Sequence, residues 1–195
     1  DFIPADSEHS AMSMAIGASA TGVRTFTATA SHGLALMHEM LYVPPQVRLP
    51  ILLVNVNRSL GAGSGIWVEY NDSMAERDSG WMQVYAEDSQ EVLDMVIQAY
   101  RIAEDPRVVL PFMLCLDGFI LSHTVERVEV PDQEEVEQVH DVRSGTEEAS
   151  VGEEPRVRHH AVVWAHGHSL DVPTAMQHFQ RSCPFHALLA IASRV

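Results

Sequence analysis

The acidic side chain of Glu8 lies at the start of a stretch made mostly of small and apolar residues, positions 7–41. A carboxylate in such surroundings can exchange a proton with a bound ligand, because desolvation disfavours its charged form. The alternative is an ordinary acid at a helix N-terminus, where the macrodipole favours a negative charge. The stretch around Glu8 leaves both interpretations open.

Arg58 directly follows an apolar run, residues 49–57. Its guanidinium can bind a carboxylate through two parallel hydrogen bonds, and the alternative is a solvated loop arginine. The sequence LGAGSG at 60–65 invites comparison with a phosphate-binding loop. No Lys-Ser/Thr pair follows it, however, and the chain contains no lysine. A mobile loop beside a cleft is the other interpretation of this glycine-rich segment.

Capping residues and periodicity predict the elements that position these side chains. Ser7 is the expected N-cap of a first helix, Gly22 its end, and Ser31 with Gly33 the turn before a second helix. Ser89 is expected to cap a later helix. Strands are predicted at residues 24–29, 49–57, 81–86, 108–116 and 126–130, a helical turn at 73–77, and a short acidic helix from Asp132.

The strongly apolar strands indicate the fold class. A strand that is apolar along its whole length is typical of a parallel sheet covered by helices on both faces. The alternation of such strands with helices predicts an α/β domain of three layers, with a mainly parallel sheet.

Composition narrows the classes of partner. The formal net charge of −15 argues against binding to nucleic acid or to an anionic membrane surface. The sequence contains no run of about 18 apolar residues, the length that could span a bilayer. Cys115 and Cys183 are far apart and fit no CxxC pattern, so we expect a reducing cytoplasm and neither a disulfide nor structural zinc.

Four long segments together resemble one protein family. They are SEHSAMSMAIGASATGVRTFTATASHGLALMHEMLY, RLPILLVNVNRSL, DSMAERDSGWMQVYAEDSQEVLDMVIQAYRIAED and LPFMLCLDGFILSHTVERVEVPDQEEV. They are similar to the α-subunit of 2-oxoacid:ferredoxin oxidoreductases of the pyruvate synthase type. The resemblance covers roughly residues 5–138 and implies a thiamine diphosphate fold, specifically the pyrimidine-binding domain.

The resemblance also implies an activity and a set of site residues. The family catalyses oxidative decarboxylation of a 2-oxoacid, here expected to be pyruvate, to acyl-CoA in anaerobic metabolism, and passes the electrons to ferredoxin. Glu8 corresponds to the acid that contacts the cofactor's aminopyrimidine ring, and Arg58 to the arginine that meets the substrate carboxylate. His32 and Gly33 are further expected cofactor contacts, although the family usually has glutamine at the position of His32.

Other parts of the family's active site are missing from the sequence. The upstream Tyr-Pro-Ile-Thr-Pro-like motif, the GDG-type motif for diphosphate and Mg²⁺, and the cysteine clusters for iron–sulfur centres are absent. We therefore expect a β-subunit that carries the diphosphate and Mg²⁺ site, an iron–sulfur subunit, ferredoxin and coenzyme A as partners. No metal site is expected on this chain.

Both ends of the sequence look atypical. Residues 1–4 open without methionine, which favours a fragment. Seven of the eleven histidines lie from His140 onward, and a metal site at 159, 160, 166 and 168 is one interpretation. We instead expect residues 1–138 to form a partial thiamine diphosphate domain and residues 139–195 a poorly ordered or frame-shifted tail. Residues 142–168 can be back-translated and read one base over as a lysine-containing linker like the family's.

Two other functional classes remain for comparison. The first is a non-catalytic thiamine diphosphate-type module that only assembles or regulates a complex. An orientation of Glu8 away from any cleft would favour it. An NAD-type oxidoreductase would need GxGxxG after the first strand, and that motif is absent. The identity of the 2-oxoacid stays open among pyruvate, 2-oxoglutarate, branched-chain and aryl acids.

Overall fold

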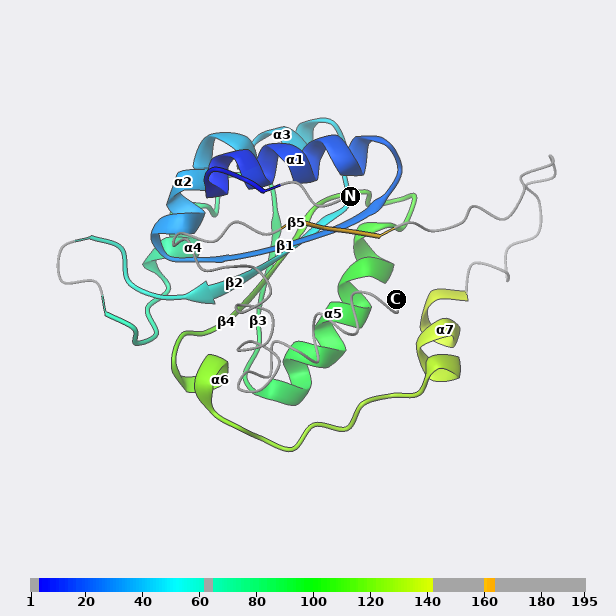
Figure 1. Ribbon diagram of the computed structural model, residues 1–195. Coiled ribbons are helices and arrows are strands. Elements are labelled where there is room, and N and C mark those ends of the chain that lie inside the picture. The colour runs from blue at the N-terminus through cyan, green and yellow to red at the C-terminus, as the bar shows by residue number, and fades with distance from the viewer. Residues whose placement is uncertain (1–3, 62–64, 142–159, 164–195) are drawn as a thin grey trace.

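A parallel sheet with helices on both faces forms the framework (Figure 1). The computed structural model describes residues 4–61, 65–141 and 160–163. The strand order is β3-β4-β2-β1-β5, and every neighbouring pair is parallel. The strands are β1 (Arg24–Ala30), β2 (Ile51–Asn57), β3 (Met82–Tyr85), β4 (Phe112–Asp117) and β5 (His160–Val163).

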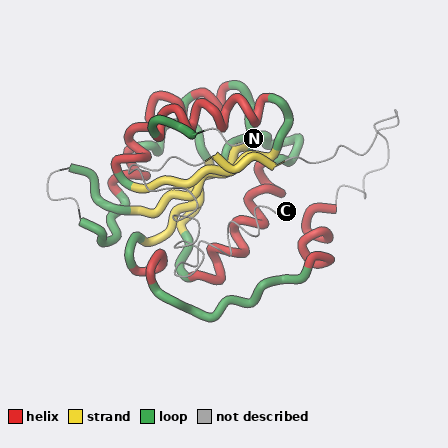
Figure 2. Tube along the Cα trace, in the orientation of Figure 1, coloured by secondary structure: helices red, strands yellow, loops and turns green. Residues whose placement is uncertain are grey.

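Helices cover the sheet on both sides (Figure 2). They are α1 (Glu8–Ala20), α2 (His32–Leu41), α3 (Val43–Gln46), α4 (Asn71–Ala75), α5 (Ser89–Ala103), α6 (Ile120–His123) and α7 (Gln133–Asp141). Helices α1 and α2 pack on one face of the sheet and α5 on the other. Helix α7 packs on α5, where Val136 meets Leu93 and Ile97. The predicted three-layer α/β architecture with a parallel sheet is therefore confirmed.

The central strand β2 explains the long apolar run at 49–57. Leu52 and Val54 pack into the core beneath α5, whereas Ile51 and Leu53 pack against α1 and α2. All four side chains are buried. A strand with helices on both faces has no solvent-facing side, so it carries apolar residues at successive positions.

The start and end of α1 agree with the sequence prediction. The Ser7 hydroxyl accepts a hydrogen bond from the backbone N–H of Ser10, and the Ser10 hydroxyl accepts one from the Ser7 N–H. This reciprocal pair is a capping box, with serine in place of the usual glutamate. Beyond the helix, Gly22 has φ +84°, a conformation that favours glycine.

The two other predicted helix starts need correction. Asp88 caps α5 through its carboxylate, which accepts from the Glu91 N–H, so Ser89 is the first helical residue and not the cap. Helix α2 begins at His32, which places Gly33 inside the helix and leaves Ser31 alone as the turn residue. In both places an acidic side chain, Asp88 or Asp72, satisfies the backbone groups at the helix start.

The predicted strand at 126–130 is wrong. The Glu129 N–H donates to the side-chain oxygen of Gln90, and the Gln90 amide donates back to the Glu129 carbonyl. A side chain of α5 therefore takes the place of a neighbouring strand. Strand β4 also begins later than residue 108, after Pro111, which has no N–H to donate, and Val109, whose φ is +42°.

Only part of the expected tail is described. Helix α7 continues to Asp141, and the four residues of β5 pair with β1 from Arg24 opposite His160. The positions 159, 166 and 168 of the possible metal site lie outside the described residues, as does most of the region 139–195. Among the described helices, none is long and apolar enough to cross a membrane.

Candidate active site

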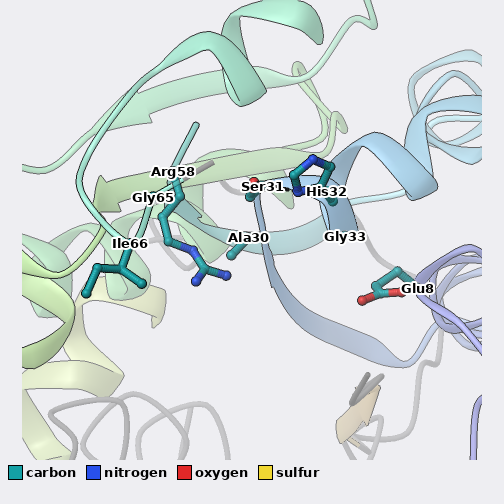
Figure 3. A pocket seen from close by; sticks show the side chains of 8 residues that line it. All are labelled: Glu8, Ala30, Ser31, His32, Gly33, Arg58, Gly65 and Ile66. Carbon is teal, nitrogen blue, oxygen red and sulfur yellow. Dashed lines mark hydrogen bonds between the residues drawn. The ribbon is translucent and has the colours of Figure 1, made fainter. Parts of the chain in front are cut away.

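A cavity of about 280 Å³ lies at the carboxyl ends of β1 and β2. It is lined by Glu8, Ala30, Ser31, His32, Gly33, Arg58, Gly65 and Ile66 (Figure 3). The carboxyl edge of a parallel sheet is where open α/β folds bind ligands. The structure thus brings together all four residues singled out from the sequence, namely Glu8, His32, Gly33 and Arg58.

Glu8 reaches the cavity because Gly33 leaves room for it. Glu8 is the first residue of α1, and its side chain extends from that helix toward the open space (Figure 3). A Cβ atom at position 33 would lie 3.1 Å from Glu8 Oε1 and 2.4 Å from Thr29 Oγ1. Within the part of the chain that the structure describes, the Glu8 carboxylate has no hydrogen-bond or ion-pair partner. Its oxygens are therefore available to a ligand.

Arg58 approaches the same space from the other side (Figure 3). Its backbone N–H donates to Asp72 Oδ2 at 3.1 Å. Its Nε is buried and has no hydrogen-bond partner among the described residues. A partly buried cation without a counter-charge is unfavourable, so the site favours an anionic ligand for this guanidinium.

Asp72 connects the ends of β1 and β2, which are followed by Ser31 and Arg58. Its side chain is almost fully buried, and its two oxygens accept five N–H groups. The donors are the backbone N–H groups of Ser31, Arg58 and Ser73 and the side-chain amides of Asn55 and Asn57. Charge-assisted bonds of this kind are among the stronger hydrogen bonds in proteins. The sequence analysis missed Asp72, although two asparagines in an apolar strand signal a buried polar partner.

His32 links the turn after β1 to the loop after β2. The Gly61 N–H donates to His32 Nε2 at 3.3 Å, so the neutral ring carries its proton on Nδ1, 3.2 Å from Ser31 Oγ. Ser31 Oγ donates in turn to the Ser59 carbonyl at 2.6 Å. This chain of bonds, together with Asp72, holds Ser31 at φ +48°.

Two other titratable side chains near the carboxyl edge of the sheet stay protonated, so they are poorly suited to act as a nucleophile or a base. Burial raises the pKa of the Cys115 thiol to about 12, so it stays protonated and unreactive. A hydrogen bond to Asp117, with a smaller effect of burial, raises the pKa of Tyr70 to about 12. Among the described residues, no cluster of three or more His, Cys, Asp or Glu side chains could bind a metal ion.

The sequence matches the family described as pyruvate flavodoxin/ferredoxin oxidoreductase, thiamine diphosphate-binding, over residues 1–188. The chain belongs to this family. The predicted resemblance and the thiamine diphosphate fold are both confirmed. The family match extends beyond residue 138, whereas individual relatives match over 134–138 residues.

Individual relatives support the same placement. The chain is 62% identical over 136 residues to pyruvate synthase subunit PorA of Methanocaldococcus jannaschii. It is 53% identical over 137 residues to ketoisovalerate oxidoreductase subunit VorA of Pyrococcus furiosus. Each match covers 70% of this chain, but only 35% and 34% of the respective relative. The chain therefore spans about a third of the length of these relatives.

A solved structure of the same enzyme class has a related fold. It is a 2-oxoglutarate:ferredoxin oxidoreductase from Magnetococcus marinus, with a TM-score of 0.51 and 28% identity. The match covers 59% of this chain and 21% of that chain. The three proteins are named for three different 2-oxoacids, so they agree on the class of enzyme and not on one substrate.

Replacement of Asp72 tests the link between the strand ends. Asp72→Asn should lower the free energy of unfolding by about 2–4 kcal/mol, because one amide oxygen cannot accept all five donors. Urea denaturation of the purified chain measures the change. The matched control is Asp78→Asn, whose exposed carboxylate pairs with the exposed Arg77, and it should leave the midpoint unchanged. If the two variants have equal urea denaturation midpoints, Asp72 does not stabilise the link between the strand ends.

Proposed function

We propose that this chain is part of the α-subunit of a pyruvate:ferredoxin oxidoreductase. The enzyme would convert pyruvate and coenzyme A to acetyl-CoA with release of carbon dioxide and transfer of electrons to ferredoxin. The observation that carries this proposal is one cavity lined by the carboxylate of Glu8 and the guanidinium of Arg58. The 62% identity to a pyruvate synthase subunit favours pyruvate over other 2-oxoacids.

The residues on the α1 side of the cavity fit the pyrimidine end of thiamine diphosphate. The cofactor supplies a nucleophilic carbon for attack on the 2-oxoacid carbonyl when it is bound. Glu8 would share a proton with a pyrimidine ring nitrogen, a role that suits a carboxyl with no partner among the described residues. Gly33 would admit the ring next to Glu8, since its missing side chain is what opens this corner. His32 would border the ring while its two nitrogens hold Gly61 and Ser31.

Arg58 would bind the carboxylate of the 2-oxoacid. Its fork of N–H groups matches the two oxygens of a carboxylate, and its charge would be neutralised when the substrate binds. Ile66, also in the cavity lining, offers an apolar surface there. A small monocarboxylate such as pyruvate needs only one cation, which is consistent with a single arginine in the described lining.

The remaining functions would belong to other subunits. A β-subunit would hold the diphosphate and Mg²⁺, and an iron–sulfur subunit would pass electrons to ferredoxin. Residues 1–138 would form most of the thiamine diphosphate domain, and β5 from the region 139–195 adds an edge strand to its sheet. We place the assembled enzyme in the cytoplasm, in keeping with a chain whose described helices are unsuited to cross a membrane.

The competing proposal is a non-catalytic assembly module with the same fold. It is favoured if Glu8 turns away from any cleft. The location of Glu8 in the lining of the cavity, opposite Arg58, supports the catalytic alternative. An inactive module would also have no reason to hold an uncompensated arginine in the lining of the same cavity.

Glu8→Gln tests the acid role. In the assembled enzyme this change should lower turnover about 10²–10⁴-fold, because an amide cannot share the proton. Binding of thiamine diphosphate should weaken only modestly, and exchange of the cofactor's C2 proton, followed by NMR, should slow in parallel. Glu39→Gln, at a carboxylate that is 84% exposed on α2, is the control. Unchanged turnover in Glu8→Gln would refute the assignment.

Arg58→Lys tests substrate binding. Lysine keeps the charge but loses the planar fork, so KM for pyruvate should rise more than the dissociation constant for thiamine diphosphate. Steady-state kinetics and cofactor titration measure the two quantities. Arg77→Lys, at an exposed arginine outside the cavity, should alter neither. Equal effects on cofactor and substrate would point to a structural role for Arg58.

Association with other subunits also has a measurable consequence. Leu36 on α2, Tyr42 directly after α2 and Val47 directly after α3 are 51%, 36% and 56% exposed. The isolated chain should therefore self-associate or bind a hydrophobic dye, and Leu36→Gln should reduce that binding. Light scattering and dye fluorescence report the two effects. A monomer that binds no dye contradicts this expectation.

A further inference from the structure

Gly118 lies directly after β4 and beside Arg58. Its backbone N–H donates to the carbonyl of Asn57 at 3.0 Å, which ties the end of β4 to the end of β2. A Cβ atom at position 118 would lie 2.3 Å from the Asn57 carbonyl oxygen. The same atom would lie 2.5 Å from Arg58 Cγ and 3.3 Å from Arg58 Cδ. Distances under 3.0 Å are not found for real Cβ contacts, so no side chain fits here without a shift.

The reason for glycine at this place is space and not backbone conformation. The described glycines with positive φ are Gly22, Gly61 and Gly80, and Gly118 is not one of them. Alanine could therefore adopt the Gly118 backbone angles. What it could not do is share the volume that the Arg58 stem and the peptide before Arg58 already fill.

The orientation of Arg58 depends on this packing. Asp72 fixes the Arg58 backbone N–H, but the buried Nε has no hydrogen-bond partner among the described residues. A long side chain without such a partner is oriented chiefly by the walls along its methylene stem. A side chain at position 118 would overlap Cγ and crowd Cδ of Arg58, so the bare glycine leaves the space that this stem occupies, and the guanidinium beyond it points into the cavity (Figure 3).

We propose that Gly118 is a positioning residue for Arg58, which sets the orientation in which the guanidinium meets the substrate carboxylate. This inference rests on the proposed role of Arg58 as the group that binds the 2-oxoacid. Gly118 itself touches no substrate. It acts by keeping both the Asn57–Arg58 peptide and the Arg58 stem where they are.

The test is Gly118→Ala in the assembled enzyme, with Gly17→Ala as the matched control. A Cβ at the helical Gly17 meets nothing within 4 Å. Gly118→Ala should raise KM for pyruvate about 10- to 100-fold, the scale expected for a misplacement near 1 Å, with thiamine diphosphate affinity little changed. Gly17→Ala should match the unmodified protein. Phenylglyoxal modification of Arg58, read by mass spectrometry without substrate, should become faster in Gly118→Ala and not in Gly17→Ala.

The same substitution in an Arg58→Ala enzyme distinguishes an effect through Arg58 from a general loss of structure. In Arg58→Ala enzyme, the further change Gly118→Ala should leave KM for pyruvate unaltered, because there is no guanidinium to misplace. If KM rises equally in both backgrounds, Gly118 does not act through Arg58. If Gly118→Ala alone fails to fold, recovery of a folded double variant supports the stem contact. An unfolded double variant assigns the damage to the Asn57 carbonyl, which also lies too close to a Cβ at position 118, and overturns the role through the Arg58 stem.

The outcomes also separate this inference from the proposed function. A raised KM in Arg58→Ala with a normal KM and normal modification rate in Gly118→Ala refutes the positioning role alone. A normal KM in both variants, with faster modification in Gly118→Ala, refutes the substrate role of Arg58 but keeps the steric relation between the two residues.

Discussion

The buried carboxylate of Asp72 is the interaction on which the arrangement of the site depends. It accepts N–H groups from the ends of two adjacent strands, Ser31 after β1 and Arg58 after β2. Parallel strands leave such backbone groups unpaired where they diverge, and burial makes an unpaired N–H costly. Asn55 and Asn57 direct their amide N–H groups to the same carboxylate and leave their buried oxygens without partners among the described residues. The polar network is therefore organised around this one anion.

Because the strand ends are held in place, the cavity can contain two charged side chains that no other described residue neutralises. Glu8 and Arg58 approach one space from different elements, and neither has a charged partner in the part of the molecule that is described. Uncompensated charges cost stability, and here the packing at Gly33 and Gly118 keeps them at the cavity despite that cost. Charges placed before a ligand arrives need little reorganisation when it binds. This is the property expected of a binding site for a polar cofactor and an anionic substrate.

The sequence was sufficient for the framework, and the four residues singled out from it line one cavity. Apolar periodicity predicted the parallel sheet, whereas the roles expected for Glu8 and Arg58 came from the family resemblance, because the residues alone left two interpretations open. Contacts that depend on tertiary packing were not predictable. The strand expected at 126–130 gave way to the Gln90 side chain, and the role of Asp72 depends on donors 14 to 41 residues away. A glycine chosen for space, such as Gly118, looks in the sequence like any turn glycine.

The position of the network explains how the cavity can be formed by the residues of one chain. The five described donors to Asp72 already occupy both of its oxygens and link the ends of β1 and β2 within one chain. Two glycines then take complementary parts. Gly33 admits the carboxylate on the α1 side, and Gly118 admits the stem of the arginine on the β4 side. Because packed interiors deform little, a partner that completes this cavity would meet Glu8 and Arg58 already in place.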